Sequence, residues 1–226
     1  MKHIVFLTGA GMSAESGIST FRDNGGLWEQ YDVMEVASID GWHKNPSLVQ
    51  EFYNERRKQL EKTEPNEGHK LIAELEKEFK VTVITQNVDD LHERAKSSHI
   101  IHLHGELTKA CNENKTEVID IGYRSIEAGE KAKDGSKLRP FIVWFGEDVP
   151  LMEKAANLTA NADIVVIIGT SMQVYPAAGL VNYAKKNIPL FLIDPNGTDK
   201  CLPGVKLIKE KASIGIKILK ERLFAL

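Results

Sequence analysis

The run Ile4-Val5-Phe6-Leu7-Thr8 leads directly into Gly9-Ala10-Gly11-Met12-Ser13-Ala14, and this junction indicates a class of fold. A short apolar strand followed at once by G-x-G-x-x-A is typical of the strand-to-helix turn that holds a dinucleotide. The first glycine permits the tight turn, and the second lets the backbone approach a pyrophosphate. The small third residue allows close packing of a helix whose N-terminus faces the phosphates. A glycine-rich turn without a ligand is the alternative, because the motif is short.

Similar apolar runs, rich in Val and Ile, recur between helical patterns. Strands that alternate with helices predict an α/β fold, a Rossmann-like parallel sheet with helices on both faces, whose carboxyl edge forms a ligand crevice. Apolar residues at helical spacing in 212–226 predict a closing helix. The expected strands are residues 4–8, 81–85, 100–103, 141–145, 164–168 and 189–193.

Two segments interrupt this rhythm. Residues 24–66 contain helix-like pieces, including 46–60, and residues 106–140 are polar and rich in turn signals. We expect residues 1–226 to form a single unit in which 24–66 and 106–140 make a small lobe. The large Rossmann-like domain then takes about residues 1–23, 67–105 and 141–226.

The composition is that of a globular protein, since 42% of the 226 residues are hydrophobic and 27% are charged. The net charge of −3 provides no overall basic field, so we expect neither nucleic acid nor a membrane as partner. The two cysteines, Cys111 and Cys201, form neither a disulfide framework nor a metal-ligand pair. No run resembles a signal peptide or a membrane span, and we expect a cytoplasmic protein.

The residues after the glycine motif disfavour an ordinary dehydrogenase. The dinucleotide fingerprint has an acidic residue about 20 positions further on, at the end of the second strand. Here that region holds Glu29, Asp32 and Glu35 in a stretch without a strand pattern. A site for hydride transfer is not evident either.

Three polar side chains, Gln86, Asn87 and Asp89, follow the expected strand 81–85. At the carboxyl end of a strand they would lie in the crevice, where they could hydrogen-bond an amide or a ribose. A helix cap at Asp89 or its neighbour is the alternative.

Two histidines, His102 and His104, alternate at the end of the next strand. They could share one face and suit a metal, but no third ligand lies nearby in the sequence. A general base is the better interpretation, because imidazole titrates near neutral pH.

Six motifs in order make the chain resemble the sirtuins, which are NAD-dependent protein-lysine deacylases. The resemblance covers nearly the whole chain, from Gly9 to about Ala212. The motifs are Gly9 to Ile18, Phe21-Arg22, Gln86-Asn87-Val88-Asp89, His102-Leu103-His104-Gly105, Phe145-Gly146-Glu147 and Gly169-Thr170-Ser171.

The resemblance implies NAD as cofactor and a catalytic set of His104, Asn87 and Asp89. In this family the acyl oxygen attacks the ribose carbon as nicotinamide leaves, and the histidine corresponding to His104 acts as general base on the ribose hydroxyl. The acyl group ends on ADP-ribose. The implied cofactor-binding residues are Gly9, Ala10, Gly11, Ser13, Glu15, Ser16, Gly17, Ile18, Phe21, Arg22, Trp28, Gln86, Asn87, Asp89, Gly169, Thr170, Ser171, Asp194 and Ala212.

The resemblance also implies an acyl-lysine protein or peptide as substrate. Family members that prefer succinyl or malonyl groups carry a Tyr-x-x-Arg pair, which Tyr53 and Arg56 match. The alternative is a solvated helix face, because residues 55–58 form a charge run. The peptide would be held as an added strand between the loop after Ser171 and a segment that includes Val143, Phe145, Gly146 and Glu147.

Two departures from the family pattern stand out. Sirtuins commonly bind a structural zinc through two C-x-x-C pairs, whereas this chain has only Cys111 in that region, so we expect no zinc and no other metal. Asp194 stands where the family often has Asn, and it could still accept hydrogen bonds from the adenosine ribose. Two other functions stay open: a catalytically silent NAD or ADP-ribose binding module, and an NAD glycohydrolase or ADP-ribosyl transferase.

Overall fold

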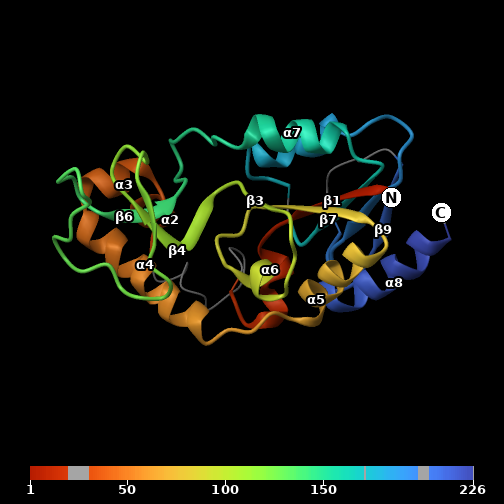
Figure 1. The fold of residues 1–226 in the computed structure, drawn as a ribbon, viewed down its shortest axis with the longest axis horizontal. Helices are drawn as coiled ribbons and strands as arrows, with labels where there is room; N and C mark the ends of the chain where they lie inside the picture. The colour runs from red at the N-terminus through yellow and green to blue at the C-terminus, as the bar shows by residue number, and fades with distance from the viewer. Residues whose placement is uncertain (20–30, 171, 198–203, 226) are drawn as a thin grey trace.

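The computed structural model describes residues 1–19, 31–170, 172–197 and 204–225 (Figure 1). Its larger part is a six-stranded parallel sheet of order β3-β2-β1-β7-β8-β9. This confirms the predicted α/β class, with one strand, β9, that the sequence did not reveal. The strands are β1 His3–Thr8, β2 Lys80–Thr85, β3 Ile100–His102, β7 Ile164–Ile168, β8 Leu190–Ile193 and β9 Val205–Ile208.

Strand β1 is buried throughout because both sheet faces are covered. Successive side chains point to opposite faces, so Ile4 and Phe6 pack in one core cluster while Val5 and Leu7 pack in another. Figure 1 shows α7 (Met152–Ala160) on one side of the sheet and α5 (Glu67–Glu74) and α8 (Ala212–Phe224) on the other. The expected closing helix is thus confirmed as α8. The 3-10 helices η4 (Ala177–Tyr183) and η3 (Leu75–Lys77) complete these layers.

The strand register brings the chemistry-bearing loops to one edge. Thr8 at the end of β1 pairs with Thr85 of β2 and Ile168 of β7, and Thr85 in turn pairs with His102 of β3. The residues that follow these strands therefore leave the sheet side by side.

The turn after β1 differs from the expected strand-to-helix junction. In place of an α-helix, two short 3-10 helices follow, η1 (Ala10–Met12) and η2 (Ala14–Ser16). The expectation that an α-helix starts at this turn is therefore wrong for residues 9–19. The Gly11 N–H donates to the Gly169 carbonyl at 2.8 Å, so the turn hydrogen-bonds to the neighbouring loop instead of starting an α-helix.

The small lobe is built from helices and a three-stranded antiparallel sheet of order β5-β4-β6. Its elements are α2 Val33–Val36, α3 Ile39–Lys44, α4 Pro46–Glu61, β4 Gly105–Cys111, β5 Val118–Asp120 and β6 Arg139–Ile142, and a short α6 Leu91–Arg94 follows β2. The sequence prediction for 141–145 is wrong. The strand there ends at Ile142 and pairs with β4 in this small sheet, since an apolar run does not specify the sheet to which it belongs.

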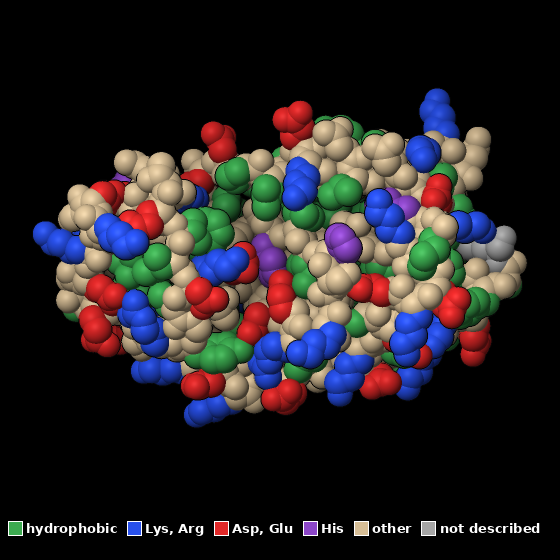
Figure 2. Space-filling model, in the orientation of Figure 1, with side chains coloured by type: hydrophobic (Ala, Val, Ile, Leu, Met, Phe, Trp, Pro, Cys, Tyr) green, Lys and Arg blue, Asp and Glu red, His purple; other side chains and the backbone are tan. Residues whose placement is uncertain are grey.

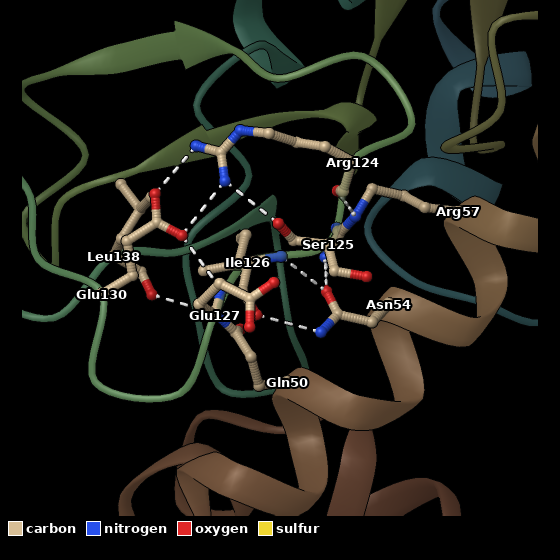
Figure 3. Close-up of polar contacts among 9 residues, drawn as sticks. All are labelled: Gln50, Asn54, Arg57, Arg124, Ser125, Ile126, Glu127, Glu130 and Leu138. Atoms are coloured by element: carbon tan, nitrogen blue, oxygen red, sulfur yellow. Dashed lines mark hydrogen bonds and ion pairs between the residues drawn. The ribbon is translucent and has the colours of Figure 1, made fainter.

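Helix α4 is joined to the 124–138 segment of the lobe by side-chain hydrogen bonds (Figure 3). Asn54 accepts from the Ile126 N–H at 2.9 Å and donates to the Ile126 carbonyl at 3.0 Å. Arg57 is 0% exposed and donates to the carbonyls of Arg124 and Leu107. A solvated face for the whole 55–58 charge run is therefore excluded, because Arg57 lies in the interior.

The visible surface mixes charges of both signs without a large patch of one sign (Figure 2). Among the described residues, no helix is long and apolar enough to cross a membrane.

Candidate active site

A cavity of about 600 Å³ lies at the carboxyl edge of the parallel sheet and reaches into the small lobe. Loops after β1, β2, β7 and β8 form its sheet side, while α4 and the segment after β6 form its lobe side. The predicted site residues that line it are Gly9, Ala10, Gly11, Ser13, Glu15, Ile18, Tyr53, Arg56, Gln86, Asn87, Asp89, His104, Val143, Phe145, Gly146, Glu147, Gly169, Thr170, Asp194 and Ala212.

The glycines of the first turn are required by the approach of two loops. A Cβ at Gly11 would lie 2.6 Å from the Gly169 Cα, and one at Gly9 would lie 2.7 Å from the Thr170 Cβ. Gly169 itself has a φ of +57°, which favours glycine. The missing side chains thus let the β1 and β7 loops touch, and the touching loops form the cavity wall.

A hydrogen-bonded network fixes the polar side chains after β2. Asn87 Nδ2 donates to the Ser13 hydroxyl at 3.0 Å and to the Gly9 carbonyl at 3.1 Å, and the Ser13 hydroxyl donates to Asp89 at 2.8 Å. Asp89 also accepts from the Leu91 N–H, so the capping interpretation holds for this residue. Burial raises the pKa of Asp89, against the opposing effect of the Ser13 hydrogen bond.

The two histidines differ in their surroundings. His104 Nδ1 lies 3.1 Å from the Gln86 carbonyl, so Nδ1 carries the proton and Nε2 holds the lone pair. Burial lowers the pKa of His104, which keeps the imidazole neutral and basic at neutral pH. His102 does not line the cavity and lies 2.7 Å from Glu93. Burial lowers the pKa of His102, but the hydrogen bond and charge of Glu93, the charge of Glu106 and the Asn87 carbonyl together raise it overall.

Helix α8 begins at one end of the cavity. Both carboxylate oxygens of Glu15 accept from Ser213, one from its N–H at 2.9 Å and one from its hydroxyl at 2.7 Å. Asp194, at the end of β8, accepts from the Asn196 N–H at 2.8 Å. Residues 194–197 after β8 therefore line this end, together with Ala212, the first residue of α8.

The lobe end holds the Tyr-x-x-Arg pair. Tyr53 is 3% exposed, and its hydroxyl oxygen accepts from Trp144 Nε1 at 3.0 Å. Arg56 lines the same cavity, with its guanidinium carbon 5.6 Å from the centre of the Phe52 ring. Burial lowers the pKa of Arg56, although the charges of Tyr53 and Asp89 oppose the shift.

The segment after β6 has few free backbone N–H groups on which a peptide strand could add. The Val143 N–H donates to the His104 carbonyl and the Phe145 N–H to the Ala37 carbonyl. The Glu147 carboxylate accepts two hydrogen bonds from Arg139 and one each from Lys115 and the Trp144 N–H. A peptide strand added here therefore could not use the N–H groups of Val143 and Phe145.

Some of the predicted residues do not line this cavity. Ser16 accepts a hydrogen bond from Asn66, and Gly17 ends η2 with a φ of +88°. The predicted residues Phe21, Arg22, Trp28 and Ser171 lie outside the described residues. Cavity residues that sequence reasoning missed include Ala37, Asn196, Gly197 and Lys211, whereas Trp144 lies within the predicted peptide-binding range 143–147. Of these residues, Asn196 and Gly197 could have been found from the sequence, because an Asn-Gly pair signals a turn after the strand that ends before Asp194.

The donor set near Cys111 does not fit a zinc ion. Its thiol is buried, lies 3.9 Å from the Pro140 carbonyl, and has its pKa raised by burial to about 11. Asn112, the next residue, instead hydrogen-bonds Thr116 and Asp134. Within the parts of the chain that the structure describes, no three His, Cys, Asp or Glu side chains are grouped to hold a metal.

Sequence comparison places residues 9–176 on the model of the Sir2 family. A protein from Bacteroides thetaiotaomicron named NAD-dependent protein deacylase is 55% identical over 99% of this chain and 98% of its own length. A Helicobacter pylori protein of the same name is 52% identical, with the same two coverages.

Solved structures agree with the sequence matches. A Sir2 homologue in complex with NAD superposes with a TM-score of 0.89 at 37% identity, over 99% of this chain and 90% of its own. A Sir2 structure with a deacetylated p53 peptide and 3′-O-acetyl ADP-ribose gives 0.82 at 28% identity, over 97% of this chain and 92% of its own. A matching family model, two nearly full-length relatives and a shared fold together make this chain a member of the Sir2 family.

Proposed function

We propose that this chain is an NAD-dependent protein deacylase, which removes acyl groups from lysine side chains of protein or peptide substrates. The observation that carries the proposal is the position of His104. Its basic Nε2 belongs to a neutral imidazole on the wall of a cavity that also contains Asn87 and the glycine turn. The names of the relatives and the ligands in related structures support the same activity.

The residues divide the work as follows. NAD, when bound, supplies the ribose carbon that accepts the acyl oxygen as nicotinamide leaves. His104 accepts the proton of the ribose hydroxyl at Nε2, because Nδ1 is held by the Gln86 carbonyl. Asn87 uses its amide N–H groups on Ser13 and Gly9, so its oxygen remains to accept from the cofactor. Asp89 keeps Ser13 oriented and acts as a positioning residue.

The deciding experiment measures nicotinamide release from NAD with and without an acyl-lysine peptide. A deacylase releases nicotinamide only with the peptide, in step with loss of the acyl group. Release without peptide would support the glycohydrolase or transferase alternative, and NAD binding without any turnover would support the silent binding module.

The side chains at the lobe end of the cavity support a proposal about which acyl group is removed. We propose that Arg56 and Tyr53 bind the terminal carboxylate of succinyl- or malonyl-lysine, since Arg pairs with a carboxylate and Tyr adds one hydrogen bond. Acetyl-lysine offers no such carboxylate. A charge-assisted hydrogen bond of about 1.5 to 3 kcal/mol corresponds to roughly 10- to 150-fold in kcat/KM.

The matched test of this preference uses one peptide sequence carrying either acyl group. We expect Arg56→Met to lower the ratio of succinyl to acetyl kcat/KM toward 1. Glu51→Gln, an exposed position on the same helix, serves as the control. An unchanged ratio in Arg56→Met, or a wild type that prefers acetyl-lysine, would refute the assignment.

We further propose that the enzyme works without a structural zinc. The support is that hydrogen bonds hold this lobe together: side chains of α4 bond to the carbonyls of Ile126 and Arg124, and Asn112 bonds to Asp134. A four-thiolate zinc site would need three further cysteines beside Cys111.

A further inference from the structure

Trp144 stands out among the cavity residues because it makes the only hydrogen bond recorded for the Tyr53 hydroxyl within the described residues. The indole Nε1–H lies 3.0 Å from the Tyr53 oxygen, and the two rings come from α4 and from the segment after β6. An indole nitrogen can only donate a hydrogen bond. The Tyr53 oxygen must therefore be the acceptor in this contact, and its own proton remains to be donated elsewhere.

Other aromatic and charged side chains pack against Trp144 and hold this contact in place. The Arg139 guanidinium carbon lies 3.6 Å from the centre of the Trp144 ring, and Trp42 packs on the same ring at 5.3 Å. Arg139 is 2% exposed and forms an ion pair with Glu147, which also accepts the Trp144 backbone N–H at 2.8 Å. With both its ring and its backbone fixed, Trp144 has little freedom to withdraw its N–H from Tyr53.

The direction of the Tyr53 proton has a chemical consequence at this end of the cavity. Tyr53, Arg56 and Trp144 all line the wall, so a ligand that enters meets a hydroxyl that is already used as an acceptor. Such a hydroxyl can donate a hydrogen bond to a ligand group that accepts one, such as a carboxylate, but it makes no hydrogen bond with a methyl group. Burial also raises the pKa of Tyr53 to about 12, so the proton stays in place across the working pH range.

We infer that Trp144 is a specificity-positioning residue: it fixes the Tyr53 hydroxyl as a donor toward the acyl group and thereby favours acyl groups that end in a carboxylate. This inference rests on the proposed deacylase function and names a residue through which that function selects its substrate. It also gives Glu147 and Arg139 a role, since they hold Trp144 in place.

The test is a double-mutant cycle on Trp144→Phe and Tyr53→Phe, measured with succinyl-lysine and acetyl-lysine versions of one peptide. Trp144→Phe keeps an aromatic ring beneath Arg139, removes the N–H donor and leaves a smaller ring. We expect kcat/KM for the succinyl peptide to fall about 3- to 10-fold, through KM, while that for the acetyl peptide stays within twofold. In the Tyr53→Phe background, Trp144→Phe should have no further effect.

The control is Glu51→Gln, an exposed position on α4, the helix that carries Tyr53. It should leave the succinyl-to-acetyl ratio unchanged. The Trp144 indole resonance, identified by its loss in Trp144→Phe, should shift in Tyr53→Phe and not in Glu51→Gln, which reports the contact independently of activity.

An equal loss on both peptides, or the same loss in the Tyr53→Phe background, would overturn the inference. Failure of the proposed function would look different, because wild type would then deacylate neither peptide. In that case the same cycle is measured on the Kd of the two peptides by calorimetry, and an additive cycle there overturns the inference as well.

Discussion

The burial of His69 on α5 predicts how much unfolding free energy the protein loses in acid. Its ring is 0% exposed, lies 4.8 Å from the His92 ring, and has neither nitrogen hydrogen-bonded within the described residues. Burial lowers the pKa of His69 to about 4, and it also lowers the pKa of His92. Because protonation would place a charge in this interior, acid should destabilise the fold through this pair.

The sign and the size follow from proton linkage. The folded-state pKa of His69 lies below the value of about 6.5 in the unfolded chain, so the unfolded state binds more protons between these two values. The contribution of neutral His69 to the free energy of unfolding is therefore complete above pH 6.5 and is lost as the pH falls toward 4. At 1.36 kcal/mol for each unit of pKa shift, His69 alone should lower the free energy of unfolding by about 2 kcal/mol at pH 5 relative to pH 7.

The assay compares urea unfolding of wild type and His69→Phe at pH 7 and pH 5. The substitution keeps a ring in the site and removes the titration, so the loss of unfolding free energy on acidification should be smaller by about 2 kcal/mol. His99→Gln, at an exposed position, is the control. An equal acid loss in His69→Phe and wild type would refute the reasoning.

Three further predictions concern catalysis and the lobe. His104→Ala should lower the deacylation rate by about 10²- to 10⁴-fold, and a near wild-type rate would remove His104 as general base. Asn54→Ala breaks both hydrogen bonds to Ile126 and should cost about 1 to 3 kcal/mol in unfolding free energy, whereas the exposed Glu51→Ala should cost at most about 0.5. Elemental analysis should find no stoichiometric zinc and EDTA should leave the Tm unchanged; zinc that is lost together with the fold on chelation would contradict the zinc-free lobe.

The parallel sheet was predictable because its strands are local apolar runs. Residues 4–8 and 164–168 are apolar almost throughout, as strands covered on both faces must be, and both are central strands of the sheet. Strand β9 escaped prediction because two of its side chains are exposed and its run is short. The strand at 139–142 was assigned to the wrong sheet, since pairing with β4 depends on contacts distant in the sequence.

The features of the candidate site were likewise predictable where they depend on local sequence, and not where they depend on contacts between distant residues. Motifs such as Gly9-Ala10-Gly11 and the pair of Tyr53 and Arg56 are readable because their spacing is local, and the structure brings both to one cavity. The contact between Trp144 and Tyr53 was not predicted, because it spans 91 positions. The burial of Arg57 was missed for a similar reason, since the carbonyls that satisfy it lie on other segments of the lobe.

The most direct test of the proposed function follows the fate of the acyl group. Wild-type enzyme is incubated with NAD and a succinyl-lysine peptide, and mass spectrometry quantifies nicotinamide, free lysine peptide and the acyl-bearing product. The cavity chemistry predicts equal amounts of nicotinamide and deacylated peptide, with the succinyl group carried by ADP-ribose. Free succinate formed without NAD, or nicotinamide released without loss of the acyl group, would contradict it.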